Sequence, residues 1–194
     1  MDLHRTIKQH HPARELEILS DVRPYSEKAR TDIRTSFLIE QVKIIGEQAF
    51  WGNNCLEDCS KRHGWKLNIL AQPASVGDEV YGFVVYKVDM KQRILQIQYI
   101  AVADKHRRHG AGSKLIKALQ KYASKVLTRS MVDRIACACV PEAVEFYQKH
   151  NFRKCKRIIP EENEREVILP DGMVEKQIPL QFHMEWKVPG KCPR

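Results

Sequence analysis

The sequence predicts one α/β (α+β) domain, built on a mixed, mostly antiparallel sheet of about six or seven strands flanked by helices. Segments rich in β-branched and aromatic residues alternate with stretches that carry apolar residues at helical spacing. Two strand-like segments, 79–90 and 94–102, are joined by a short turn, which is typical of an antiparallel hairpin. A helix-like stretch follows this hairpin, and a strand–helix–strand order comes later, so the sheet should be mixed.

The first part of the chain should contain two strands and two helices. Residues 15–22 alternate apolar and polar side chains, which predicts a strand. Residues 26–50 have the spacing of one long helix, and a shorter helix is expected over 54–63. The next strand is predicted over 65–71, and a turn over 72–78 follows because that segment contains Pro, Ser and Gly.

After the hairpin, the elements alternate. Apolar residues between 115 and 127 form a helical stripe with lysines on the opposite face. Residues 133–140 contain few charges, as expected of a buried strand. Pro141 suits the first turn of a helix that continues over 142–150.

The last two strands are predicted over 152–159 and 180–188. Between them lies a charged excursion, 160–172, which contains Pro, Gly and four glutamates. No repeat, low-complexity segment or internal linker interrupts the chain. We therefore expect residues 1–194 to form a single domain with a core over about 15–188.

Composition limits the class of protein. No apolar run approaches the ~20 residues of a membrane span, and the first residues are polar, so an intracellular protein, cytoplasmic or nuclear, without membrane association is expected. The net charge of +9 fits either a basic surface that serves solubility or an anionic partner. That partner could be a phosphorylated cofactor, a nucleic acid or an acidic protein.

The cysteines do not predict a metal site. Cys55, Cys59 and His63 would share one face of a helix, but they offer three ligands and no suitable second pair is near. A half-buried helix face is the simpler interpretation. In an intracellular chain the six cysteines are expected to be free thiols.

The segment ADKHRRHGAG, residues 103–112, lies between a predicted strand and an amphipathic helix. Gly110 and Gly112 let the backbone bend and approach a ligand, because no Cβ is in the way. The first N–H groups of the helix lack intrahelical acceptors, and the helix dipole adds positive potential there. These features predict a phosphate-binding turn, although glycines at such a turn can also serve the bend alone. The cationic side chains around it are Arg107, Arg108, His109 and Lys114.

This turn resembles the signature of the GNAT superfamily of N-acetyltransferases, which is Arg or Gln, two residues, Gly, one residue, then Gly or Ala. Arg107, Gly110 and Gly112 satisfy it. The stretch AVEFYQKHNF at 143–152 is similar to the family's A-x-x-F-Y-x-x-x-x-F pattern. The order of predicted elements also resembles the family's. The nucleotide-binding patterns GxxxxGK(S/T) and GxGxxG are absent from the turn.

The resemblance implies acetyl-CoA as cosubstrate. Backbone groups of the strand before the turn would pair with the pantetheine arm, and backbone N–H groups of the turn would hold the pyrophosphate. Phe146 would lie along the pantetheine end. The implied cofactor-binding residues are Ile100, Ala101, Val102, Arg107, Arg108, His109, Gly110, Ala111, Gly112, Ser113 and Phe146.

The resemblance also suggests catalytic residues. Tyr147 matches the family's tyrosine near the thiol, where it would protonate the leaving thiolate, unless it is only an aromatic packed between helix and sheet. Histone-acetylating relatives place a glutamate close to the position of Gln96. Gln cannot accept a proton at neutral pH, so Gln96 or Gln98 could only orient a water that does. Glu79 is a candidate base, with a surface carboxylate as the alternative. Val140 stands where relatives often have Asn.

The sequence thus predicts an N-acetyltransferase that moves an acetyl group from acetyl-CoA to a primary amine by direct attack. The acceptor is expected to belong to a protein or peptide, with a small-molecule amine as the alternative. A non-catalytic acyl-CoA-binding domain is a further alternative, because a carboxylate is missing at Gln96. Nucleic acid is not expected as a partner, since no known motif is present and only 8% of residues are aromatic.

Overall fold

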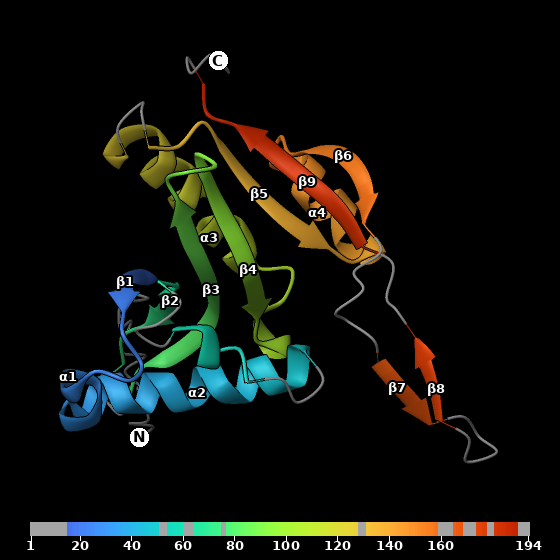
Figure 1. Ribbon diagram of the computed structural model, residues 1–194. Coiled ribbons are helices and arrows are strands. Elements are labelled where there is room, and N and C mark those ends of the chain that lie inside the picture. The colour runs from blue at the N-terminus through green and yellow to red at the C-terminus, as the bar shows by residue number, and fades with distance from the viewer. Residues whose placement is uncertain are drawn as a thin grey trace, which may run out of the picture.

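The computed structural model describes residues 15–50, 54–59, 64–74, 77–127, 131–158, 165–168, 174–177 and 181–189. Seven described strands form one sheet in the order β1-β2-β3-β4-β5-β9-β6 (Figure 1). Neighbouring strands are antiparallel except β4 and β5, which are parallel. The strands are β1 Glu17–Val22, β2 Lys66–Gln72, β3 Glu79–Asp89, β4 Ile94–Val102, β5 Arg134–Cys139, β6 Arg153–Ile158 and β9 Gln181–Lys187.

Helices cover both faces of this sheet. The α-helices are α1 Glu27–Thr31, α2 Ile33–Ala49, α3 Ala111–Lys121 and α4 Val144–Lys149. Figure 1 views the sheet from the side of α2, and α3 and α4 lie behind it. The chain therefore has the predicted architecture, a mixed, mostly antiparallel sheet flanked by helices.

Each face of the sheet has its own apolar core. The core under α3 and α4 contains Leu115 of α3 and Met184 of β9, both fully buried. The core under α2 contains Val42 and Phe83, which are also fully buried. Burial of apolar surface on both faces explains why the central strands have so few charged residues.

The predicted helix over 26–50 is divided in two. Asp32 separates α1 from α2, and its side chain accepts a hydrogen bond from the backbone N–H of Thr35 at 3.0 Å. This is an N-cap, which satisfies a donor that a continuous helix would bond internally. A break at Asp32 therefore replaces the single helix that the apolar spacing indicated.

The predicted helix over 54–63 is wrong for its described part. That part forms a turn and a short 3₁₀ helix, Glu57–Cys59. The side-chain oxygen of Asn54 accepts the N–H of Leu56 at 3.1 Å, and such local bonds compete with helix formation. His63 lies outside the described residues.

The excursion between the last two strands has secondary structure of its own. Strand β7, Arg165–Ile168, pairs antiparallel with β8, Val174–Gln177, as a separate two-stranded sheet. In Figure 1 this ribbon extends away from the main sheet. The sequence pattern predicted a charged excursion with Pro and Gly over 160–172, and no strand was assigned there.

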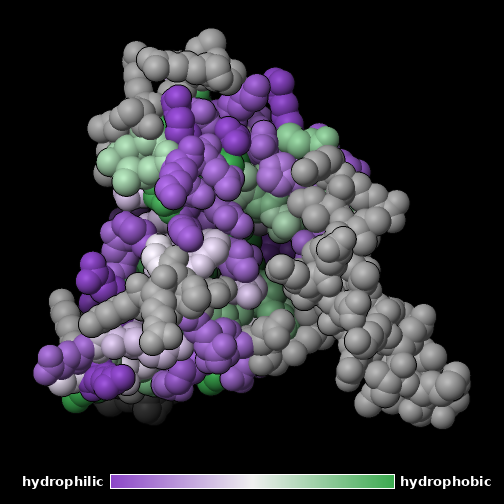
Figure 2. All heavy atoms as spheres, in the orientation of Figure 1, coloured by the Kyte–Doolittle hydropathy of each residue, from purple (hydrophilic) through white to green (hydrophobic). Residues whose placement is uncertain are grey.

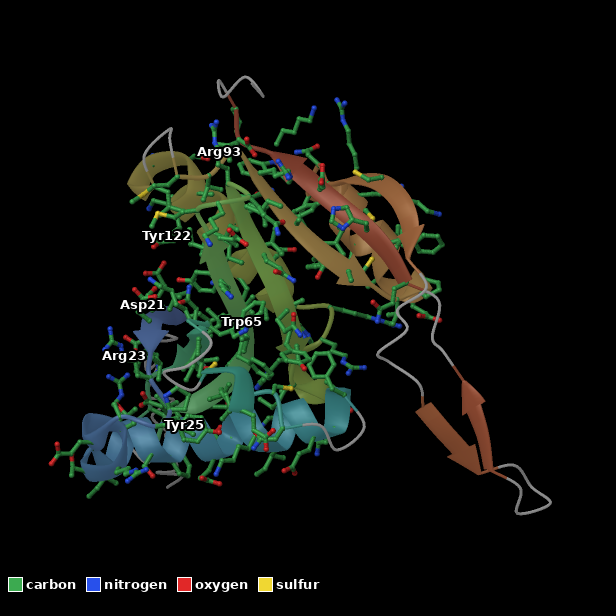
Figure 3. All side chains as sticks on the ribbon, in the orientation of Figure 1. Asp21, Arg23, Tyr25, Trp65, Arg93 and Tyr122 are labelled. Atoms are coloured by element: carbon green, nitrogen blue, oxygen red, sulfur yellow. The ribbon has the colours of Figure 1, made fainter. Side chains whose placement is uncertain are left out.

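A cluster of polar side chains connects β1 to β2 and β3 by hydrogen bonds. Asp21, at a φ of 55°, donates its backbone N–H to the side-chain oxygen of the buried Asn68 at 3.1 Å. Its carboxylate accepts from the Tyr86 hydroxyl at 3.2 Å and from Lys66. Tyr122 packs edge-on against Tyr86, and Figure 3 shows Asp21 and Tyr122 on the same flank of the molecule.

Hydrophilic residues cover most of the described surface in the view of Figure 2. Among the described helices, none is long and apolar enough to cross a membrane.

Candidate functional site

The central feature of the site is a fork between the two parallel strands. β4 and β5 pair only from Ile94 with Arg134 to Ile97 with Cys137. β4 continues to Val102, and on its other side it stays paired with β3 up to Gly82. The edge of β4 that faces β5 is therefore open from residue 98 onward among the described strands.

A β-bulge produces this fork. The register between β3 and β4 passes from Val85 opposite Tyr99 to Tyr86 opposite Ile97, which leaves Gln98 as an extra residue. A bulge bends its strand and increases the local twist, so β4 leaves β5 at this point. From residue 98 to residue 102 the open edge is roughly 13 Å long, and its backbone donors and acceptors can pair with an extended ligand as an added strand would.

The turn that is predicted to bind phosphate lies beyond the open end of β4. A short 3₁₀ helix, Asp104–His106, leads into the turn, and α3 begins directly after Gly110. Gly110 has a φ of 81°, a conformation that glycine adopts without strain. A Cβ at Gly110 would meet nothing within 4 Å, so this backbone faces open space. The first N–H groups of α3 are thus presented at the turn, as anion binding requires.

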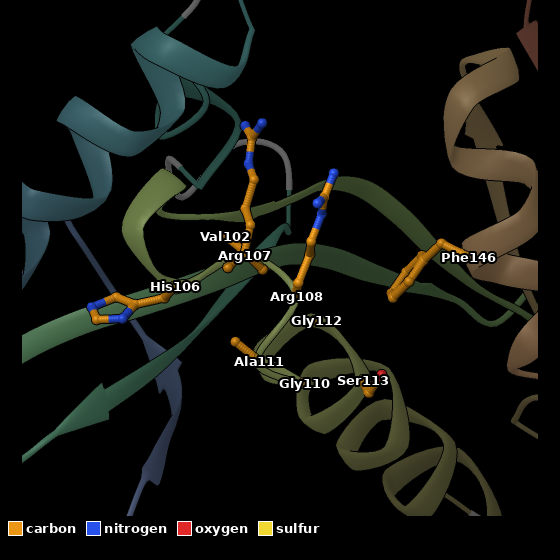
Figure 4. A pocket seen from close by; sticks show the side chains of 9 residues that line it. All are labelled: Val102, His106, Arg107, Arg108, Gly110, Ala111, Gly112, Ser113 and Phe146. Carbon is orange, nitrogen blue, oxygen red and sulfur yellow. The ribbon is translucent and has the colours of Figure 1, made fainter.

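A cavity of about 310 Å³ opens at this turn (Figure 4). Figure 4 shows Arg107 and Arg108 extending from the turn in the same direction, with Phe146 across the opening. Gly112 keeps the opening free, because a Cβ there would lie 3.2 Å from the Phe146 ring. The lining residues are Val102, His106, Arg107, Arg108, Gly110, Ala111, Gly112, Ser113 and Phe146. A cationic mouth over a helix N-terminus can hold a diphosphate, which is the group that the predicted cosubstrate requires.

Three of the predicted cofactor-binding residues lie outside this lining. Ile100 packs against the core under α3 and α4, and Ala101 is buried in the core under α2, on the opposite face of the sheet. Both lie on the open stretch of β4, where the backbone of Ile100 is predicted to pair with the pantetheine arm. His109 is exposed at the turn. The cofactor-binding roles of all three stay predictions.

Ser113 connects the turn to the end of α4. Its hydroxyl is 2.9 Å from Nε2 of His150, and the His150 carbonyl accepts from the side chain of Gln120 at 2.9 Å. Burial lowers the pKa of His150, and the positive charge of Lys117 lowers it further. His150 is therefore neutral near pH 7 and accepts the Ser113 proton, which holds the first turn of α3 against α4.

His106 lines the cavity, and sequence reasoning did not select it. Its ring stacks on Tyr81 with centroids 3.6 Å apart, and its Nε2 is 3.1 Å from a Glu79 oxygen. The Tyr81 hydroxyl in turn donates to Gln72 at 2.6 Å. These contacts of His106 hold the turn against strand β3. Its place directly before Arg107 was a signal that could have suggested such a role.

Glu79 is held in ion pairs instead of being free to act as a base. Its carboxylate contacts Lys105 and His106. The hydrogen bond from Lys105 is the main cause of its lowered pKa. A carboxylate with a lowered pKa is a weaker proton acceptor, so the geometry favours a structural role at the turn.

Tyr147 lies inside the protein, close to the fork. Its side chain is only 3% exposed and packs between Phe146 and Phe152, with ring centroids 5.2 and 5.3 Å away. It is hydrogen-bonded to Cys137, the last residue of β5 that pairs with β4. Burial raises the pKa of Tyr147 well above its usual range, so the hydroxyl keeps its proton. This burial fits a packing role, and the raised pKa makes the phenol a weaker proton donor than a free tyrosine, so the acid role of Tyr147 stays a prediction.

Gln96 lies on the exposed face of β4, opposite Lys87 on β3 and Ala136 on β5. It precedes the bulge, and its side chain points away from α3 because its neighbours Leu95 and Ile97 belong to the core under α3. Its predicted role in orienting a water stays a prediction.

Cys55 and Cys59 are both buried in the core under α2. In the described part of the chain, no group of three or more His, Cys, Asp or Glu side chains could hold a metal ion.

Residues 69–154 match the family model described as an acetyltransferase (GNAT) domain, and this confirms the predicted resemblance to the GNAT superfamily. A search of curated protein sequences found no significant match.

Solved structures of N-acetyltransferases share the fold. NAA60 of Arabidopsis thaliana in complex with acetyl-CoA is similar with a TM-score of 0.64 at 14% identity, over 91% of this chain and 100% of that chain. GCN5 of Tetrahymena is similar with a TM-score of 0.57 at 15% identity, over 90% and 96%. The spermidine/spermine N-acetyltransferase SpeG of Vibrio cholerae is similar with a TM-score of 0.58 at 12% identity, over 89% and 95%. The chain therefore has the GNAT fold.

Proposed function

We propose that this chain is an N-acetyltransferase that moves an acetyl group from acetyl-CoA to a primary amine by direct attack. The observation that carries the proposal is the continuity between the open edge of β4 and the cavity at the N-terminus of α3. An extended thioester with a diphosphate at one end fits such a path. The match to a GNAT domain over 69–154 supports the same activity.

Each part of the site has a separate task in this proposal. Backbone N–H groups at Gly110–Ser113 and the side chains of Arg107 and Arg108 bind the pyrophosphate. The open edge of β4 orients the pantetheine arm toward the fork at Gln98. Bound there, acetyl-CoA supplies an acetyl thioester whose carbonyl a neutral amine attacks. Tyr147 holds a proton at the fork, where the sulfur leaves.

The acceptor is proposed to be an amine of a protein or peptide. The face of the fork that is not covered by α3 carries exposed Gln96, Gln98 and Ala138. Such an open surface can accommodate a chain longer than a single small amine. Relatives by fold include enzymes named for polyamines, so a small amine is the competing acceptor.

The test is the release of free thiol from acetyl-CoA with a panel of acceptors. The panel contains peptides with a free α-amine, peptides with an internal lysine and a blocked N-terminus, and spermidine. We expect thiol release, with mass spectrometry showing one added acetyl group, for at least one peptide. Transfer only to spermidine would reassign the acceptor, and no transfer to any amine would refute the activity.

A non-catalytic acyl-CoA-binding domain is the second candidate, because Gln96 stands where a proton-accepting carboxylate was expected. Titration calorimetry separates the two functions. Tight binding of acetyl-CoA without thiol release for any acceptor supports the binding domain.

A further inference from the structure

The two faces of β9 differ in what they contact. Phe182, Met184 and Trp186 pack against the core under α3 and α4. Side chains of successive strand residues point to opposite faces, so His183 and Glu185 lie on the other face of the sheet. This is the face that carries Gln96 and the exposed Ala138.

The strand register places His183 beside the fork. His183 is the partner of Ala138 on β5, one residue after Cys137, where pairing with β4 ends. Glu185 is the partner of Ala136, which is itself opposite Gln96 on β4. Neighbouring strands are about 4.8 Å apart, so His183 lies one strand from the point at which β4 and β5 separate.

Glu185 orients the imidazole of His183. Nε2 of His183 is 2.9 Å from Oε1 of Glu185. An ionised carboxylate only accepts, so the neutral ring donates from Nε2 and keeps the Nδ1 lone pair for a proton. Both side chains are about three-quarters buried, with 24% and 23% exposed, which limits competition from water. Nδ1 of His183 has no hydrogen-bond partner among the described residues.

From this arrangement we infer that His183, held in its tautomer by Glu185, is the general base that takes the proton from the acceptor amine. The inference rests on the proposed N-acetyltransferase activity and supplies the proton acceptor that Gln96 cannot be. In the reaction the amine nitrogen bonds to the acetyl carbon and the carbon–sulfur bond breaks. One amine proton passes to Nδ1 of His183, and the thiolate takes a proton from Tyr147 or from water.

The groups around Glu185 explain why its carboxylate orients the ring and why His183 is the proton acceptor. Glu185 lies 3.4 Å from Nε of Arg134 on β5 and also contacts Cys155 on β6. Burial raises the pKa of Glu185, but the hydrogen bond from His183 and the charge of Arg134 outweigh it, so the net pKa is lowered. Glu185 therefore stays ionised and orients the ring, and the histidine is the group that can gain a proton.

The test compares three variants in single-turnover assays at saturating acetyl-CoA. His183→Gln keeps a donor for Glu185 but has no basic nitrogen. We expect its rate to fall by ~10²–10⁴ with unchanged acetyl-CoA affinity. His183→Ala should show a similar loss, and added imidazole should restore part of the rate. Lys187→Gln, on the same face of the same strand, is the matched control and should keep the wild-type rate.

The pH profile supplies a readout that a structural role would not change. Removal of the general base should change the pH dependence of the single-turnover rate in His183→Gln. Wild type and variant are compared with the same acceptor, so that ionisation of the amine affects both equally. Wild-type rates in His183→Gln, or a loss that imidazole does not rescue together with an unchanged pH profile, would overturn the assignment of the base. A wild-type protein that acetylates no amine would instead overturn the proposed function, and the role of His183 with it.

Discussion

The substitution Gly110→Asp isolates the electrostatic part of the proposed pyrophosphate site. Gly110 is the N-cap of α3, with a φ of 81°, and a Cβ there would meet no atom within 4 Å. The folded chain can therefore accept a larger side chain without a clash. The left-handed conformation costs a residue with a Cβ about 1 kcal/mol, which lowers Tm by about 2–4 °C in a chain of this size. Asn and Asp tolerate that conformation best.

The effect on ligand binding should be much larger than the effect on folding. The Asp carboxylate would add a negative charge at the mouth of the cavity that Gly110 lines. Two unit charges at about 6 Å repel by about 3 kcal/mol at an effective dielectric constant of about 20. Since 1.4 kcal/mol is a factor of ten, acetyl-CoA should bind about 100-fold more weakly.

Gly110→Asn is the matched control, because it has the same shape and backbone cost without the charge. Titration calorimetry with acetyl-CoA measures both affinities, and thermal unfolding checks that both variants fold. If Gly110→Asp binds acetyl-CoA within threefold of Gly110→Asn, the diphosphate does not lie at this turn.

Three further predictions concern Tyr147 as the acid, the packing of Gly82 of β3 against β4, and the ion pair of Glu79 with Lys105. Tyr147→Phe should lower the single-turnover rate by ~10²–10⁴ without changing acetyl-CoA affinity, whereas wild-type rates would retire Tyr147 as the acid. Gly82→Ala should destabilise the fold by about 1–3 kcal/mol, because its Cβ would lie 2.5 Å from the Ala101 carbonyl; an unchanged Tm would contradict this packing. The pKa of Glu79 is lowered in the folded state, so its pairing with Lys105 stabilises the fold above the unfolded pKa near 4.3 and is lost on further acidification. Glu79→Gln should therefore lose less stability between about pH 5 and 3 than the wild type, as measured by denaturant unfolding, and an equal loss would exclude this pair as the cause.

The turn at 103–112 could be predicted from the sequence because its chemistry is local. Gly110 adopts the left-handed conformation, and Gly112 lies against Phe146, so the spacing of the two glycines has a direct geometric meaning. The order of strands and helices was also predictable, since each element carries its own hydrophobic period. Local competition by side chains at Asp32 and Asn54 explains the two helix predictions that differ from the structure.

The sequence by itself thus determined the fold class, the helix N-terminus and the cationic turn. Only the tertiary structure decided the fork, the burial of Tyr147 and the placement of His183. The bulge at Gln98 depends on how β4 pairs with β3, and no local pattern marks it. His183 and Ala138 are far apart in the chain, and they become neighbours only because β9 inserts between β5 and β6. Strand register determines which residues that are distant in the sequence become neighbours. The register depends on how each whole face of the sheet packs against its core, and no single segment of the sequence encodes that packing.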